Sequence, residues 1–144
     1  MANRLYSVLK RPRGQFARVH PDVSVSQCVQ IMKSSDIGAL VVMDEYNIIG
    51  IVSERDIVRN LVHEGLNANE TKVGDILCAR VSILDINESV EAAMQVITET
   101  RRRHLLVAEE GDVVDVLSIG DVLYYLLEDH KRTIEHLEQY IHGG

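Results

Sequence analysis

An internal duplication constrains this chain more than any other feature. When the 144-residue sequence is displaced against itself by 65 positions, polar and apolar positions match without a gap from about Pro21 to Val58. Leu40-Val41-Val42 falls on Leu105-Leu106-Val107, and Ser53-Glu54-Arg55-Asp56 falls on Ser118-Ile119-Gly120-Asp121. Self-similarity at a fixed period indicates a repeated structural unit. The chain is therefore predicted to contain two copies of one unit.

Each copy has the pattern of a β-α-β-β-α unit. Ser24 to Gln27 resembles a helix capping box, and apolar residues at helical spacing follow it. Residues 39–43 and 48–52 are short apolar runs, separated by turn-forming residues, and are predicted to be strands. One such unit leaves a sheet face exposed, so two units are expected to cover each other. The predicted fold class is α/β, in its mixed α+β form: a pseudo-twofold pair with a cleft between the copies.

The repeat also suggests domain boundaries. We predict a basic N-terminal arm with a short helix at 1–18, repeats at 19–66 and 67–128, and a helical extension at 129–144. The last helix keeps apolar residues at helical spacing to its end: Leu123, Leu126, Leu127, Ile134, Leu137 and Ile141. A helix with one apolar stripe packs on a partner subunit or back on its own domain.

The first 18 residues are locally basic. They contain five cations and no acid: Arg4, Lys10, Arg11, Arg13 and Arg18. One interpretation is a solvated arm. The other is that some of these cations reach a phosphate group, because a phosphate attracts lysine and arginine.

Composition argues against several classes of protein. The net charge of −7 disfavours non-specific binding of nucleic acid. No apolar run approaches the ~18 residues of a membrane span, and no signal-peptide core is visible, so we expect a cytoplasmic protein without membrane binding. Cys28 and Cys78 lack metal-ligand spacing, and Cys28 is expected in a helix core. The spacing of His130, His136 and His142 does not suit a metal site either, so these side chains are expected to be exposed.

The strand and helix motifs resemble the CBS-domain family, named after the regulatory domain of cystathionine β-synthase. In the first copy they are Ile37-Gly38-Ala39-Leu40-Val41-Val42 and Gly50-Ile51-Val52-Ser53-Glu54-Arg55-Asp56. In the second they are Arg103-His104-Leu105-Leu106-Val107 and Val116-Leu117-Ser118-Ile119-Gly120-Asp121. The resemblance covers about residues 5–128. It looks most like the small stand-alone bacterial and archaeal tandem pairs, including the lead-in from Thr71 to Leu77.

This resemblance implies a pseudo-twofold pair, or Bateman module, that dimerises into a flat disc. It also implies an adenosine-containing ligand in the cleft, from the set AMP, ADP, ATP, NAD and S-adenosylmethionine. AMP is our first expectation, with ATP, ADP or NAD as the others. A homodimer or a higher oligomer is expected, together with a regulated partner protein that the sequence does not name.

Ser53 and Asp56 are the first candidate binding residues. A helix N-terminus offers unpaired N–H groups to an anion, and Asp56 could accept hydrogen bonds from both ribose hydroxyls. Arg55, in the same turn, could pair with a phosphate. A Ser followed three residues later by an acid is also nearly a plain capping box, which would be purely structural.

Residues around Gly38 are the second candidates. The family brings backbone groups up to the adenine ring here, and glycine permits a close approach because it has no side chain. Ile37, Ala39 and Leu40 would then flank the ring. An ordinary loop glycine is the alternative. Arg18 and His20 precede the first helix, on the strand that commonly edges the pocket in the family, and are further candidates.

The second copy departs from the pattern. Asp115 stands where the first copy has Gly50, Gly120 replaces Arg55, and Leu106 replaces a proline common in the family. Ser118 and Asp121 are kept, so a ribose could still dock. Arg103 and His104, within the cluster 101–104, could supply a phosphate contact. Three arginines at a helix end also suit the helix dipole.

Three hypotheses for function remain open. The first is a regulatory sensor that binds an adenine nucleotide in the cleft and catalyses nothing. The second is an enzyme, for which the sequence offers no triad, metal cluster or Walker-type loop as a candidate catalytic site. The third is a structural dimerisation or interaction module without bound nucleotide.

Overall fold

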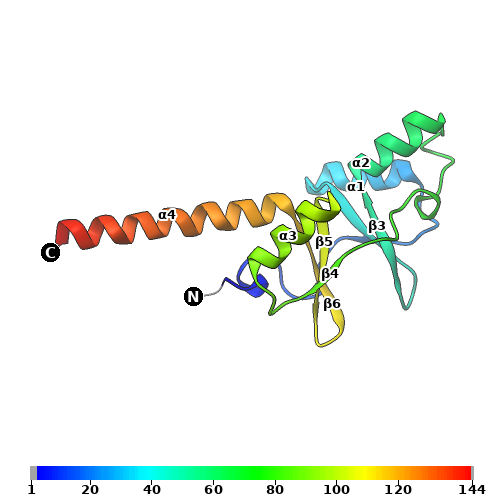
Figure 1. The fold of residues 1–144 in the computed structure, drawn as a ribbon. Helices are drawn as coiled ribbons and strands as arrows, with labels where there is room; N and C mark the ends of the chain where they lie inside the picture. Colours follow the sequence, from blue (N-terminus) through cyan, green and yellow to red (C-terminus); the bar gives the residue numbers. More distant parts are fainter. Residues whose placement is uncertain (1–2, 144) are drawn as a thin grey trace. The chain divides into compact units, whose positions relative to one another are not determined.

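Each copy of the repeat folds around its own three-stranded sheet. In the computed structural model, which describes residues 3–143, the strand orders are β1-β2-β3 and β4-β5-β6. In each sheet the first strand is parallel to the second, and the second is antiparallel to the third. The predicted mixed α+β fold and the β-α-β-β-α order are confirmed (Figure 1).

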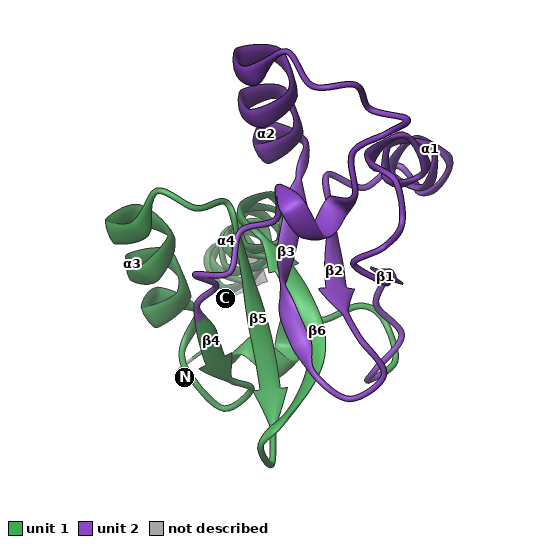
Figure 2. Cartoon of the chain, turned by 90° about the vertical axis from the view of Figure 1, so that its right-hand side faces the viewer, with its two compact units in different colours: residues 1–12, 83–144 green, residues 13–82 purple. Residues whose placement is uncertain are grey.

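The first repeat lies in a compact unit of residues 13–82, called unit 2 (Figure 2). Its elements are β1 (Arg18–Val19), α1 (Val25–Ser35), β2 (Ala39–Met43), β3 (Ile48–Ser53), α2 (Glu54–Ile57), a π-helical turn (Val58–Val62) and a 3-10 turn (Val73–Asp75). Ser24 and Gln27 form the expected capping box at the start of α1. Cys28 is buried in the core with Leu40 and Val42, as predicted, and this burial raises the pKa of its thiol.

The second repeat lies in unit 1, which combines residues 1–12 with 83–144 (Figure 2). Its elements are a 3-10 turn (Leu5–Ser7), β4 (Ile83–Asp85), α3 (Val90–Thr100), β5 (His104–Glu109), β6 (Asp112–Ser118) and α4 (Ile119–Gly143). Its core gathers Leu5 and Val8 from the chain start with Val90, Leu105 and Leu117 from the repeat. The segment around Leu5 and Val8 is therefore part of this core.

The displacement of 65 positions holds in the backbone as well. Ala39 pairs with Ser53, and His104 pairs with Ser118 at the corresponding position of the second sheet. Both hairpins carry an irregularity at the matching step, after Val42 and after Val107. The two units are thus the same structure locally, down to the bulge.

A 3-10 turn from outside the repeat completes each unit. In unit 1, the backbone N–H groups of Leu5 and Tyr6 donate to the carbonyl oxygens of Glu88 and Ile86 at 2.9 and 3.1 Å. In unit 2, the N–H groups of Val73 and Gly74 donate to Val23 and Pro21 at 2.8 and 2.9 Å. The lead-in before the second repeat, with Val73 and Gly74, thus packs on unit 2. The segment with Leu5 and Tyr6 packs in the same way on unit 1.

The unit borders therefore differ from the boundaries drawn on the sequence. In space, residues 1–12 are grouped with the second repeat, and residues 67–82 are grouped with the first. A weaker alignment carries the signal: Leu5-Tyr6-Ser7-Val8-Leu9 matches Val73-Gly74-Asp75-Ile76-Leu77 at a displacement of 68. Because this displacement differs from 65, a gapless comparison of the two copies does not detect the match between residues 5–9 and 73–77.

Gly50 is required by a close backbone approach. Ile51 and Cys78 form an isolated antiparallel bridge, with N–H to carbonyl distances of 3.0 and 2.8 Å. A Cβ atom on Gly50 would lie 2.2 Å from the carbonyl oxygen of Cys78. Such an overlap forces the backbone apart, so Gly50 allows the lead-in to dock on β3.

We predict that Gly50→Ala lowers the free energy of unfolding by about 1–3 kcal/mol, because the added methyl group overpacks a tight backbone contact. Urea denaturation of the purified protein measures this change. Gly38→Ala is the matched control, since a Cβ there would meet only the Glu54 carboxylate, at 3.8 Å. Equal stability of the two variants would contradict the assigned role of Gly50.

Candidate functional site

Ser53 and Asp56 face each other at the junction of β3 and α2. The Ser53 backbone N–H and hydroxyl both donate to Oδ2 of Asp56 at 2.9 Å, and the Asp56 N–H donates to Ser53 Oγ at 3.2 Å. Both residues are half-buried. This geometry is the capping box that the sequence allowed as the structural alternative. A ribose contact at the same carboxylate stays a prediction.

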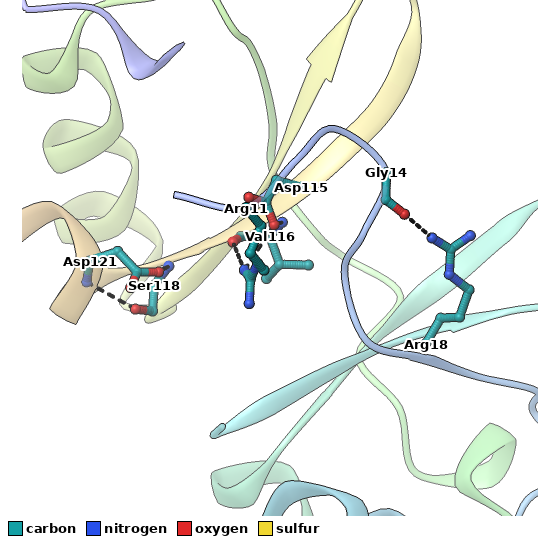
Figure 3. A network of polar contacts seen from close by, with 7 residues as sticks. All are labelled: Arg11, Gly14, Arg18, Asp115, Val116, Ser118 and Asp121. Carbon is teal, nitrogen blue, oxygen red and sulfur yellow. Dashed lines mark hydrogen bonds and ion pairs between the residues drawn. The ribbon is translucent and has the colours of Figure 1, made fainter. Parts of the chain in front are cut away.

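The second copy repeats this arrangement between β6 and α4 (Figure 3). The Asp121 N–H donates to Ser118 Oγ at 3.0 Å, and the Ser118 N–H donates to Asp121 Oδ2 at 2.9 Å. Both side chains are again half-buried. The two serine–aspartate pairs are therefore equivalent elements of the two units.

Gly38 lies beside the first of these pairs. Its carbonyl oxygen accepts a hydrogen bond of 3.0 Å from the N–H of Glu54, the residue that follows Ser53. The corresponding bond in unit 1 joins Ile119 N–H to the carbonyl of Arg103 at 2.8 Å. Packing does not demand a glycine at 38, because a methyl group at this position would make only an ordinary contact with Glu54. An approaching planar ligand would be one reason to keep this position bare.

The neighbours of Gly38 divide into two groups. Ile37 and Ala39 are half-buried and can line a ligand with their side chains. Leu40 is fully buried in the core of unit 2, packed with Val42 and Val52. Its side chain therefore points into the core, and only its backbone could flank a ligand.

The two candidates on and beside β1 already have partners on the chain. Arg18 donates from Nη2 to the carbonyl of Gly14 (Figure 3), and its guanidinium lies 4.2 Å from the ring centre of Phe16. The ring of His20 accepts from the Asp22 N–H through Nδ1 at 3.1 Å. Both side chains are exposed, so contact with a ligand stays a prediction for each.

The cationic candidates occupy different settings. Arg55 and Arg103 are exposed, and His104 is half-buried at the first position of β5. Arg101 ends α3 as a left-handed C-cap, so the arginine run starts at the negative end of the helix dipole. This placement favours the dipole interpretation for Arg101 and leaves a phosphate contact by Arg103 or His104 as a prediction.

An ion pair between Arg11 and Asp115 was not anticipated from the sequence. Asp115 is only 3% exposed, and its Oδ1 accepts from Arg11 Nη2 and from the Val116 N–H, both at 2.8 Å (Figure 3). The same Arg11 nitrogen donates to the Val116 carbonyl at 3.1 Å. The negative charge of Asp115 is therefore balanced within unit 1 by the guanidinium of Arg11.

The other cations of the first residues are also engaged. Arg4 donates to the carbonyl of Asn87 at 3.1 Å, and the Lys10 ammonium lies 3.7 Å from the ring centre of Tyr124. Arg4, Lys10 and Arg11 are nevertheless exposed, so these cations are solvated although their segment docks on unit 1. At a displacement of 68, Lys10 matches Cys78, the residue that faces Gly50. In the sequence, the signal for the ion pair was that the basic residues Lys10 and Arg11 align with the segment that faces Gly50, while Asp115 stands at the position of Gly50 in the second copy.

Membrane spans and metal sites are both missing from the described part of the chain. No helix within 3–143 combines the length and the apolar character needed to cross a membrane. Over the same residues, histidine, cysteine and acidic side chains form no group of three or more that could hold a metal ion. His130 and His136 are exposed on α4, as predicted, whereas the side chain of His142 lies outside the described residues.

We predict that Arg11→Ala lowers the free energy of unfolding by about 1–3 kcal/mol, because a buried carboxylate loses its charged donor. Urea denaturation measures the loss. The control is Arg132→Ala, which removes an exposed pair with Asp129 at 3.8 Å and should cost less than about 0.5 kcal/mol.

A double-mutant cycle separates this ion pair from the packing of the Arg11 stem. In an Asp115→Ala background, Arg11→Ala should have little further effect, because no carboxylate remains to be paired. Additive losses would show that the two residues stabilise unit 1 independently.

Both repeats match a known protein family. The family model for the CBS domain matches residues 9–63 and 73–128. The mitochondrial CBS domain-containing protein CBSX3 of Arabidopsis thaliana is 32% identical over 140 residues, covering 94% of this chain and 68% of that protein. A putative signal-transduction protein with CBS domains from Burkholderia ambifaria superimposes with a TM-score of 0.84 at 32% identity, covering 88% of this chain and 96% of the other.

A more distant structure adds a ligand to the comparison. CBSX2, solved in complex with AMP, superimposes with a TM-score of 0.71, covering 89% of this chain and 98% of that one. Its identity of 21% shows a shared fold and nothing more about this chain. Together with the duplicated β-α-β-β-α units, the two matched segments show that the chain belongs to the CBS-domain family, as a tandem pair.

Proposed function

We propose that this tandem CBS module is a regulatory sensor that binds an adenosine-containing nucleotide and catalyses no reaction. The observation that carries the proposal is the placement of Gly38 beside the Ser53–Asp56 pair, through the bond from Glu54 N–H to the Gly38 carbonyl. A bare backbone edge suits an adenine ring, and an adjacent carboxylate suits ribose hydroxyls. AMP is the first candidate, and the AMP complex of the structural relative CBSX2 supports this choice.

The remaining parts of the nucleotide need contacts as well. In unit 2, the exposed Arg55 lies one position before Asp56 and is our candidate for the phosphate. A single phosphate needs one such cation, whereas ATP, ADP or NAD would need more. In unit 1, Ser118 and Asp121 are proposed to hold a second, weaker site, with Arg103 or His104 as its cation. Arg18 and His20 are proposed as edge contacts.

Regulation requires a difference between two states of the module. A nucleotide shifts an equilibrium only if it binds one arrangement of the module better than the other. We propose that this shift is passed on through a dimer of the chain to a regulated protein of unknown identity. The cleft between the copies and the cytoplasmic location stay predictions; the relative CBSX3 is named as mitochondrial.

A second candidate function also has an observation in its favour. Ser53 and Asp56 satisfy each other as a capping box, and so do Ser118 and Asp121, without any ligand. A purely structural dimerisation module would need nothing more from these residues. Binding measurements decide between the two candidates.

We predict that AMP raises the melting temperature of the protein and that Gly38→Leu lowers AMP affinity by at least about tenfold, because the side chain would fill the space proposed for the ring. Isothermal titration calorimetry measures the affinity, with ATP, ADP and NAD tested in parallel. Gly38→Leu leaves the capping box intact, so the loss can be separated from a loss of folding.

Asp56→Asn tests the ribose contact. The amide oxygen can still accept the Ser53 N–H, but the charge is lost, so we expect a fall in affinity of about tenfold. Asp121→Asn is the matched variant in the second copy and should have the smaller effect. If no nucleotide at millimolar concentration shifts the melting temperature of the unaltered protein, the sensor proposal fails and the structural module is favoured.

A further inference from the structure

Helix α4 carries an exposed apolar stripe with a seven-residue period along most of its length. Within unit 1, α4 extends away from its own sheet (Figure 1). The stripe consists of Leu123, Leu127, His130, Ile134, Leu137 and Ile141, spaced alternately by four and three residues. Its apolar members are between 44% and 72% exposed. Spacing of this kind defines the a and d positions of a coiled coil.

This stripe is separate from the face by which α4 packs on its own unit. Val122 is fully buried in the core of unit 1, and Tyr125 and Leu126 pack against that core. In heptad terms these three residues occupy positions c, f and g, whereas Leu123 and Leu127 occupy d and a. Every side chain from His130 to Ile141 is exposed. The helix therefore has a second apolar face that its own core does not use.

The residue types on the stripe indicate the kind of partner. Positions a are Leu127, Ile134 and Ile141, and positions d are Leu123, His130 and Leu137. Isoleucine at a with leucine at d favours a parallel two-stranded coiled coil, and one polar core residue fixes the register at some cost in stability. His130 is the polar residue of this stripe. It can fix the register only if the partner helix has a histidine in the same layer.

The charges along α4 permit the same pairing. In a parallel pair, position g of one helix faces position e of the next heptad in the other helix. The g positions Leu126, Thr133 and Tyr140 are uncharged, so Lys131 and Glu138 at e meet no like charge. The remaining charged residues of this stretch lie on the outer positions b, c and f: Glu128, Asp129, Arg132 and Glu135.

We propose that this stripe binds a second copy of the chain, forming a parallel, in-register coiled coil from Leu123 to Ile141. All six layers would be filled, including those of the two most exposed apolar residues of the stripe, Leu127 and Ile141. An antiparallel pairing centred on Arg132 would also fill six layers, but it would set His130 opposite Ile134 instead of placing the two histidines in one layer. The proposal names the surface that joins two copies, and it does not depend on nucleotide binding.

Disulfide trapping tests the proposal in the full-length chain. In a Cys78→Ser background, in which the remaining Cys28 is fully buried, Leu137→Cys places one thiol at a d position. Facing d positions in a parallel pair bring the two Cβ atoms close enough for a disulfide. We expect Leu137→Cys to form covalent dimers at least about tenfold faster than Gln139→Cys, the matched control on outer position f.

The possible outcomes separate the proposal from its competitors. Adding Ile134→Glu to Leu137→Cys should reduce cross-linking to the level of the control, and both positions are exposed, so the units stay folded. Equal rates for Leu137→Cys and Gln139→Cys would overturn the proposal. Cross-linking seen only in a mixture of Leu137→Cys with Leu127→Cys would also overturn the proposal, because Leu137 faces Leu127 when the helices are antiparallel. Nucleotide affinity, measured separately, reports on the proposed function alone.

Discussion

The antiparallel pairing of the second and third strands is the constraint on which the rest of each unit depends. It sets Ala39 opposite Ser53 and His104 opposite Ser118, so the following helix must begin beside the preceding loop. The bond between that helix and the loop carbonyl, at Gly38 or Arg103, follows from this register. A slip of one residue would turn every core side chain to the other face. The candidate site is therefore a consequence of how the hairpin pairs.

The segment that docks on the last strand of the sheet is held differently in the two units. In unit 2, Gly50 leaves room for the backbone of Cys78 to bridge to Ile51. In unit 1, Asp115 occupies the same register position and holds Arg11 from the docked start of the chain. The first solution uses backbone hydrogen bonds and the second uses a buried ion pair. Each copy is thus matched to its own lead-in, which explains why the motif of the first copy is altered in the second.

Unit 1 also places its charges and its apolar surface differently from unit 2. Cations that looked available for a phosphate are held by the Asn87 carbonyl, the Tyr124 ring and the Asp115 carboxylate. The same unit carries α4, whose exposed stripe continues well beyond the core that anchors its first turns. The first copy keeps the Gly50 and Arg55 motif and is the one proposed to bind a nucleotide, whereas the altered copy carries the helix proposed to associate with a second chain.

The sequence by itself determined the duplication, the order of elements, the capped helices and the buried Cys28, because hydrophobic period and capping chemistry are local. It also placed the serine–aspartate pairs, since their spacing suffices for a capping box. Only the tertiary structure decided that residues 4–11 complete the second repeat, that Leu40 faces the core and that Arg11 neutralises Asp115. The contact between Arg11 and Asp115 joins positions 104 residues apart. No local period encodes such a contact, which exists only once the strands have paired.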